Sequence, residues 1–196
     1  MREVELKSVV DDMALRRRKT ESAGGKLSFE GALADIRYDT LSDDLMRRDH
    51  VLRIRTYTSG GITEGHLDWK GATRYENGFK IREEVSTPVA EPAALSSILA
   101  SLGFKVIREI EREIAQYSLL GATVRFEHYP SMDDLVEVEG DPDSIEKAIA
   151  AIGLPRTGFT SERLAEFIVR FESRTGNRAA LSARELAGEY LYHEGA

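Results

Sequence analysis

Charged and apolar residues alternate along many short segments of this chain. The first is near the start, where Glu3, Glu5 and Lys7 occupy every second position. Side chains two apart on a β-strand share a face, so the pattern predicts a strand with two carboxylates and one ammonium on one side. Three charges on one face are costly to bury without partners, so this face meets either solvent or a ligand that needs both signs of charge.

The same alternation recurs in later segments. There the polar positions are almost all charged, where a sheet face in water would usually mix its polar types. A simple solvated face is therefore the less favoured interpretation. The alternating residues are Arg53, Arg55, His66, Asp68, Lys70, Lys80, Arg82, Glu84, Arg125, Glu127, Glu137 and Glu139.

Eight strands are predicted from this period-2 pattern and from the turn residues between its segments. They lie near residues 2–10, 27–40, 50–58, 63–70, 79–86, 105–117, 122–128 and 135–140. Helical spacing predicts helices over residues 92–102 and 143–152, the second with Asp143 as N-cap and Glu146 as its capping-box partner. The fold class is therefore α+β, an antiparallel sheet with helices to one side.

The last part of the chain lacks strand alternation and predicts two further helices. Thr160 or Ser161 could cap the first, which would run through Phe171. Ser182 could cap the second, with Glu185 at the capping-box position. The apolar residues expected to face inward on this last helix are Leu186, Tyr190 and Leu191.

Composition limits the possible functions. The 196 residues are enough for one substantial domain, and the net charge of −7 argues against a general nucleic-acid binder. No apolar run reaches the length of a membrane span, and no signal peptide is recognisable. The absence of cysteine excludes thiolate chemistry and favours a cytoplasmic protein. With only four histidines, a metal would need oxygen ligands, which favours Mg²⁺ or Mn²⁺.

Closure of the sheet would turn the charged face inward around a wet lumen. Basic side chains bind phosphate oxygens directly, whereas acidic side chains bind them only through a divalent cation. A lumen rich in both signs of charge therefore suits a polyanion that carries its own metal, such as a triphosphate.

Several motifs resemble, in order, those of the CYTH superfamily of triphosphate tunnel enzymes. Glu3-x-Glu5-x-Lys7 resembles its N-terminal signature, and Glu137-x-Glu139 matches its late paired acids. Between them lie Arg53 with Arg55, Lys70, and Arg82 with Glu84. The resemblance implies a closed eight-stranded antiparallel β-tunnel over residues 1–155. Residues 156–196 would form a C-terminal helical extension that packs on the same domain.

The resemblance also implies roles for individual residues. Lys7 would lie nearest the reacting water or hydroxyl, as a phosphate contact or, with a lowered pKa, as a base. Glu84 and Lys80 would support the site. The implied metal ligands are Glu3, Glu5, Glu137, Glu139 and Glu127, and the implied phosphate ligands are Arg53, Arg55, Lys70, Arg82, Arg112 and Arg125.

The chain departs from the family pattern at several places, and two of them bear on the site. Ile114 replaces an arginine that often follows the position of Arg112, so one phosphate contact is missing or comes from Arg125. Asp35 stands where some inorganic triphosphatases have a tyrosine thought to orient water, so that mechanism does not transfer directly.

The function favoured by the resemblance is metal-dependent hydrolysis of inorganic, thiamine or nucleoside triphosphate. One alternative is a class IV adenylyl cyclase, which would attack the α-phosphorus with the ribose 3′-hydroxyl. The other is a non-catalytic module that binds polyphosphate or a nucleotide. The expected partner is a small-molecule triphosphate, with no nucleic acid and no membrane. A homodimer stays open, because related enzymes are often dimers.

Overall fold

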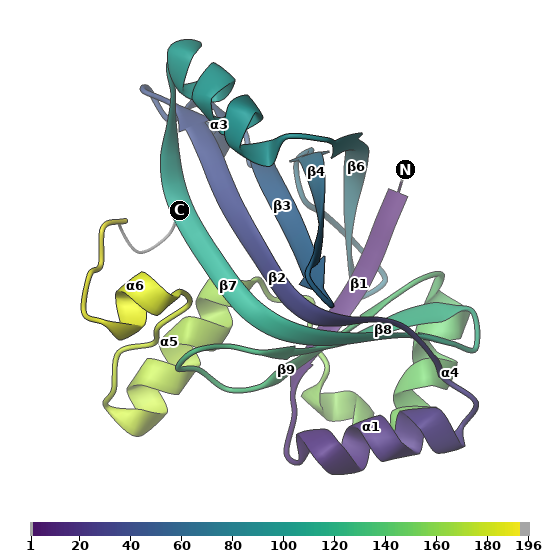
Figure 1. Cartoon of the computed structure of the whole chain (residues 1–196). Helices are drawn as coiled ribbons and strands as arrows, with labels where there is room; N and C mark the ends of the chain where they lie inside the picture. The colour runs from purple at the N-terminus through teal and green to yellow at the C-terminus, as the bar shows by residue number, and fades with distance from the viewer. Residues whose placement is uncertain (1, 193–196) are drawn as a thin grey trace.

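The computed structural model describes residues 2–192, and a sheet that closes on itself dominates it (Figure 1). Eight antiparallel strands form the ring, and a short strand β5 (Arg74–Glu76) pairs with the start of β6. The predicted closed eight-stranded barrel with helices outside it is confirmed. In spatial order the ring consists of β1 (Arg2–Val9), β9 (Leu135–Glu139), β8 (Ala122–His128), β7 (Phe104–Leu119), β2 (Lys26–Thr40), β3 (Val51–Ser59), β4 (Ile62–Lys70) and β6 (Phe79–Val89), which pairs again with β1.

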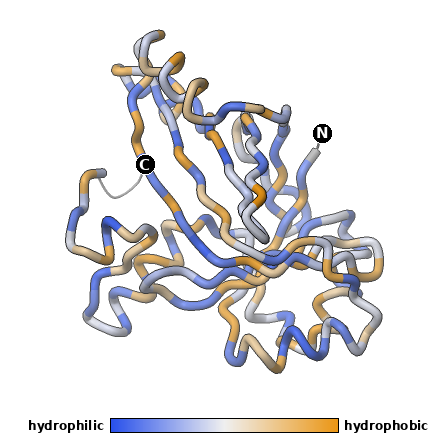
Figure 2. Tube along the Cα trace, viewed as in Figure 1, coloured by the Kyte–Doolittle hydropathy of each residue, from blue (hydrophilic) through white to orange (hydrophobic). Residues whose placement is uncertain are grey.

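The closing seam places the first charged segment beside two others. Glu3 lies opposite Arg82 of β6, while Glu5 lies opposite Glu139 and Lys7 opposite Glu137 of β9. Alternate side chains of a strand face opposite sides, so the charged positions of these strands face the lumen and their apolar positions face outward. Figure 2 shows this alternation of hydrophobic and hydrophilic residues along the long strands.

Helices pack on the outward apolar positions. The largest core lies beneath α4 (Pro142–Ile152), whose Ile145, Ile149 and Ile152 are almost completely buried. The helix α1 (Met13–Ser22) lies beside α4 (Figure 1). A smaller core forms where Leu99 of α3 (Pro92–Ser101) packs near Ile54. Among residues 2–192, no helix combines the length and the hydrophobicity needed to cross a membrane.

The C-terminal segment lies across one mouth of the barrel. Phe167 of α5 (Leu164–Thr175) and Leu181 share a core with Ile110 of β7 and with Tyr129. The backbone of Thr160 exchanges hydrogen bonds of 2.9 and 2.8 Å with that of Lys7, which ties this segment to β1. These contacts hold α5 beside the lumen. The division into a tunnel domain over residues 1–155 and a C-terminal extension over residues 156–196 that packs on it stays a prediction, and residues 193–196 lie outside the described residues.

Two helix predictions need correction at their N-termini. The helix α4 begins at Pro142, and its N-cap is Asp141, which accepts from Ser144 N at 3.1 Å. Proline fits the first helical turn because its missing N–H is not needed there. The predicted cap, Asp143, therefore lies within the first turn. The helix α5 begins only at Leu164, because Thr160 is engaged in the β-bridge to β1.

Three further differences concern helices of low apolar content. The sequence pattern did not predict α1, whose N-cap Asp12 accepts from Leu15 N at 2.8 Å, nor the short α2 (Asp44–Arg47). The last helix, α6 (Ala183–Leu186), does have Ser182 as its N-cap, but it ends at Leu186. Leu186 is 60% exposed and Leu191 is 58% exposed, so the prediction that they face inward is wrong.

Candidate active site

The barrel encloses a cavity of about 520 Å³ that reaches from the lumen to α5. All eight ring strands contribute inward side chains to it, and Leu164, Ile168 and Val169 of α5 line its mouth. Eleven Lys and Arg residues line the cavity against seven Asp and Glu residues. The lining is therefore basic in a protein whose net charge is −7, which focuses a positive potential inside the lumen.

Most of the residues predicted for the site do converge here. Glu3, Glu84 and Glu139 do not line this cavity but lie beside it: Glu3 accepts a hydrogen bond from Lys70, Glu84 lies 3.6 Å from Lys70 Nζ, and Glu139 is opposite Glu5. The convergence of distant segments in one hollow is confirmed, while the roles of single residues stay predictions. The predicted residues that line the cavity are Glu5, Lys7, Arg53, Arg55, Lys70, Lys80, Arg82, Arg112, Arg125, Glu127 and Glu137.

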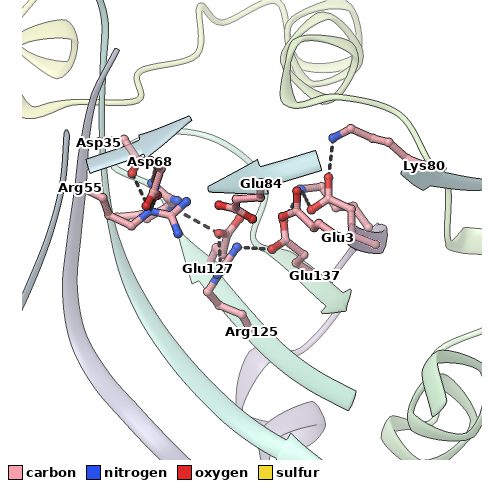
Figure 3. Close-up of polar contacts among 12 residues, drawn as sticks. Glu3, Asp35, Arg55, Asp68, Lys80, Glu84, Arg125, Glu127 and Glu137 are labelled. Carbon is pink, nitrogen blue, oxygen red and sulfur yellow. Dashed lines mark hydrogen bonds and ion pairs between the residues drawn. The ribbon is translucent and has the colours of Figure 1, made fainter. Parts of the chain in front are cut away.

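One wall of the site, built by β1 and β9, carries a cluster of carboxylates. Figure 3 shows Glu3 and Glu137 on this side, with Lys80 reaching toward them. Each bonded carboxylate has a basic partner, so charge is largely balanced within the cluster. The pairs are Lys70 with Glu3, Lys80 with Glu5, Lys7 with Glu5 at 3.1 Å, Lys7 with Glu137, and Arg125 with Glu137.

Negative charge is nevertheless in excess at one end of this wall. Burial, followed by repulsion from Glu137 and Glu3, raises the pKa of Glu139 to about 7. Burial and the neighbouring Glu5 likewise raise the pKa of Glu3, although Lys70 opposes them. Among residues 2–192, the side-chain carboxylate of Glu139 makes no hydrogen bond or ion pair, although its backbone pairs with β1 and β8. A cation bound here would relieve this repulsion.

The carboxylates of Glu3, Glu5, Glu137 and Glu139 fit a divalent metal ion. They supply only oxygen ligands, which Mg²⁺ and Mn²⁺ prefer, and they come from two hydrogen-bonded strands. Within residues 2–192, no three acidic or histidine side chains already surround a single point as a metal's ligands would. A metal would therefore have to replace some of the lysine and arginine contacts that now neutralise these acids.

Lys7 lies between this wall and the rest of the lumen. Burial lowers its pKa, but attraction to Glu137 and Glu5 outweighs burial and raises the pKa above the ordinary value. A lysine acting as a base would need a lowered pKa. A charged phosphate contact has no such requirement, and both roles of Lys7 stay predictions.

Asp35 organises the opposite side of the lumen, and the sequence pattern did not assign it to the site. It is 2% exposed and contacts three arginines. Its carboxylate lies 2.9 Å from Arg55 Nε, 3.0 Å from Arg112 NH1 and 3.8 Å from Arg53 NH1. Burial would raise the pKa of Asp35, but Arg112 and Arg53 lower it to about 2. The arginines are thereby held in place before any substrate binds.

Two more acids hold these arginines. Asp68 accepts from Arg53 Nε at 3.0 Å and from Ser86 Oγ at 2.6 Å. Glu127 Oε1 accepts from Arg112 Nε and Arg125 Nε, each at 3.1 Å. Asp68 shares a face with Lys70 in the alternation of β4. That alternation was the signal in the sequence that could have assigned Asp68 to the site. Glu127 therefore lies between two phosphate-contact candidates, and its predicted role as a metal ligand stays a prediction.

Arg37 and Arg108 are two further cations in the cavity that sequence reasoning missed. They lie directly opposite each other on β2 and β7, and Arg37 also lies opposite Arg53 on β3. Arg37 Nε is buried without a hydrogen-bond partner among the described residues. Burial lowers the pKa of Arg37 to about 10; Asp35 opposes this, and repulsion from Arg53, Arg112 and Arg108 adds to it. Arg108 lies 4.0 Å from a carboxylate oxygen of Glu185, whereas Arg37 has no ion pair within 4.0 Å among the described residues. A cation such as Arg37 indicates a place for an anion.

Comparison with known proteins places the chain in a family. Residues 1–151 match the CYTH domain family. A search of curated proteins gives no match. Among solved structures, the PH1819 protein of Pyrococcus horikoshii is 23% identical, with a TM-score of 0.70, and the match covers 86% of this chain and 98% of that one.

Two other solved structures carry descriptions of activity. A candidate adenylate cyclase of Vibrio parahaemolyticus is 17% identical, with a TM-score of 0.71 and coverage of 85% of this chain and 97% of that one. A Hippeastrum protein, described as a candidate adenylyl cyclase with a dominant triphosphatase activity, is 16% identical, with a TM-score of 0.60 and coverage of 92% and 98%. At these identities the structural likeness shows the fold alone. The family match covers most of the chain, and the chain therefore belongs to the CYTH domain family.

Proposed function

We propose that the protein is a Mg²⁺- or Mn²⁺-dependent triphosphatase that hydrolyses a triphosphate inside the barrel. The observation that carries this proposal is the basic cavity with a carboxylate wall on one side. Arginine and lysine side chains neutralise phosphate oxygens, and the carboxylates can hold the metal that accompanies a triphosphate. Few other small molecules need both basic side chains and a carboxylate-bound metal for their binding.

The residues of the chain would act mainly by positioning and by charge. Arg53, Arg55 and Arg112, held by Asp35, present fixed donors to phosphate oxygens, which avoids the cost of ordering them during the reaction. Lys7 stays protonated and stabilises negative charge on the phosphate. A metal held by Glu3, Glu5, Glu137 and Glu139 would supply further positive charge to the same oxygens. The apolar residues of α5 would limit the entry of bulk water at the mouth.

Two structural neighbours are described with two different activities, and both activities use a triphosphate. The Hippeastrum neighbour is described with a dominant triphosphatase activity and the Vibrio neighbour as a candidate adenylate cyclase. Hydrolysis needs only the phosphate and metal contacts that line the cavity, so it is the simpler use of these residues. Cyclase activity and binding without turnover are the alternatives.

One incubation separates the three possibilities. The protein is mixed with Mg²⁺ or Mn²⁺ and, in turn, ATP, tripolyphosphate and thiamine triphosphate, and phosphate, pyrophosphate and cyclic AMP are measured. We expect metal-dependent release of phosphate. Formation of pyrophosphate together with cyclic AMP would replace the proposal with the cyclase function. Metal-dependent binding without any product would identify a binding module.

Arg37 offers a test of the anion site at a residue that is not a predicted metal ligand. The variant Arg37→Met removes a half-buried cation whose Nε lacks a hydrogen-bond partner and which neighbouring arginines repel, so we expect the ligand-free protein to unfold at the same or a higher temperature. Its KM for a triphosphate should rise by about tenfold, because one charge-assisted contact is worth about 1.5 kcal/mol or more. Thermal unfolding and steady-state kinetics measure the two effects.

A matched control is Arg18→Met, which removes an exposed arginine on α1, outside the cavity. We expect this variant to change neither the unfolding temperature nor the KM. If Arg37→Met lowers the unfolding temperature and leaves KM unchanged, Arg37 is a structural residue and not an anion contact.

A further inference from the structure

The barrel has a second cavity, of about 340 Å³, at the mouth that α5 does not cover. It is formed where β2 and β4 begin and where β3, β6 and β7 end, whereas the larger cavity reaches the opposite ends of β2, β3 and β7. Arg55, a predicted phosphate ligand, lines both cavities, so the two cavities meet at this residue. The remaining lining residues are Phe29, Tyr57, Glu64, His66, Asp68, Glu84, Ser86 and Gln116.

Aromatic rings form one wall of this second cavity. The ring of Tyr57 meets the ring of Phe29 edge to face at 5.3 Å and that of His66 at 5.9 Å. All three residues are only half-buried, so ring surface stays open to the cavity. The guanidinium of Arg55 lies 5.8 Å from the centre of the Tyr57 ring, and its NH1 donates to the Tyr57 hydroxyl at 3.0 Å. The position of the ring wall is therefore fixed relative to the phosphate site.

The charge of this cavity is opposite to that of the larger one. Three carboxylates, Glu64, Asp68 and Glu84, line it against the single guanidinium of Arg55. Asp68 is already bonded to Arg53 and Ser86, and Glu84 lies 3.6 Å from both Arg53 NH2 and Lys70 Nζ. Glu64 stands exposed at the rim, where its charge is the least compensated of the three. Phosphate would be repelled by such a lining. A planar group that stacks on aromatic rings and carries N–H donors or a positive charge would be attracted.

We propose that this second cavity binds the organic part of the substrate, a planar nitrogen heterocycle with N–H donors or a positive charge. The phosphates would extend past Arg55 into the larger cavity. The substrate is then an organic triphosphate and not inorganic tripolyphosphate. This inference rests on the proposed triphosphate function. The volume of the cavity is within the range of ligand sites and is sufficient for one heterocycle.

Phe29 provides the sharpest test, because its ring packs on Tyr57 and it does not line the larger cavity. Wild type should use ATP or thiamine triphosphate with a higher kcat/KM than tripolyphosphate. Phe29→Ala should raise the KM for the preferred organic triphosphate by about tenfold, the equivalent of one aromatic contact, without changing kcat. Its KM for tripolyphosphate should not change. Phe29→Tyr should restore the wild-type KM, and Tyr75→Ala, which removes an exposed ring on β5, should have no effect.

Ligand-induced thermal shifts give a second readout that needs no turnover. With Mg²⁺ present, the preferred organic triphosphate should stabilise wild type more than tripolyphosphate does, and Phe29→Ala should remove the difference. Equal thermal shifts of wild type with ATP, thiamine triphosphate and tripolyphosphate would overturn the proposed role of the second cavity. A Phe29→Ala variant that loses as much of the shift with tripolyphosphate as with the organic triphosphate would do the same. Either result leaves the triphosphatase proposal intact. Absence of any phosphate release would instead overturn the proposed function. The thermal shifts would still show whether the second cavity binds the organic part of a triphosphate.

Discussion

Replacing Glu137 with glutamine should lower metal-dependent turnover by about a hundredfold to a thousandfold with little loss of stability. Glu137 lies where the carboxylate wall meets the phosphate-contacting cations, because it accepts from both Lys7 and Arg125. The glutamine would lose the negative charge needed to hold a metal. The fold should survive, since Lys7 keeps Glu5 at 3.1 Å and Arg125 keeps Glu127 at 3.1 Å.

Two measurements check this expectation. Phosphate release at several Mn²⁺ concentrations reports on turnover, and titration calorimetry with Mn²⁺ alone reports on metal affinity; both should fall. Glu113→Gln is the matched control, because Glu113 is exposed on β7 next in sequence to Arg112 but on the outer face. A Glu137→Gln protein that unfolds at a much lower temperature, yet keeps its turnover per folded molecule, would show a purely structural role.

The barrel and much of its charged lining were predictable because the side-chain period of a strand is fixed by geometry. Wherever charge alternates with apolar residues, as at Glu3, Glu5 and Lys7, one face must be polar. Burial of that face is then tolerable only if segments of opposite charge meet. The pairing of Lys70 with Glu3 and of Lys80 with Glu5 shows how the chain satisfies this condition.

The missed residues of the site carried the same signal over a shorter run. Asp35 and Arg37 share a face of β2 and alternate with Ile36 and Tyr38, but a register irregularity follows Arg37. Nothing in the local pattern shows that Asp35 meets three arginines, since those arginines come from β3 and β7. Contacts between strands that are distant in the sequence depend on the order of strands in the ring.

The helices were predicted less well for a different reason. The residues of α1 are mostly charged and leave no apolar stripe, and the helix is fixed by long-range contacts: Arg16 donates to the carbonyl of Gly153 at the end of α4. The position of α5 over a mouth of the barrel follows from Phe167 packing near Ile110, an inward residue of β7. Neither contact leaves a periodic trace in the local sequence.

Replacing Asp35 with alanine should destabilise the ligand-free protein by about 3–5 kcal/mol, which lowers its unfolding temperature by roughly 10 °C. The reason is that Arg53, Arg55 and Arg112 would lose a carboxylate that is 2% exposed and would be left as buried, poorly compensated cations beside Arg37. A polyphosphate can replace that carboxylate. Tripolyphosphate should therefore raise the unfolding temperature of Asp35→Ala by more than it raises that of wild type.

Thermal unfolding with and without tripolyphosphate, at fixed ionic strength, measures both effects. Asp35→Asn keeps the shape and a hydrogen-bond acceptor but not the charge, so it should be less destabilised in the absence of ligand and should also show the enlarged response. Glu113→Ala, on the outer face, should respond as wild type does. An equal shift in wild type and in both Asp35 variants would mean that tripolyphosphate does not bind these arginines. The cations of β2, β3 and β7 would then serve only to balance Asp35, Asp68 and Glu127, and the phosphate site would be confined to the wall near Lys7.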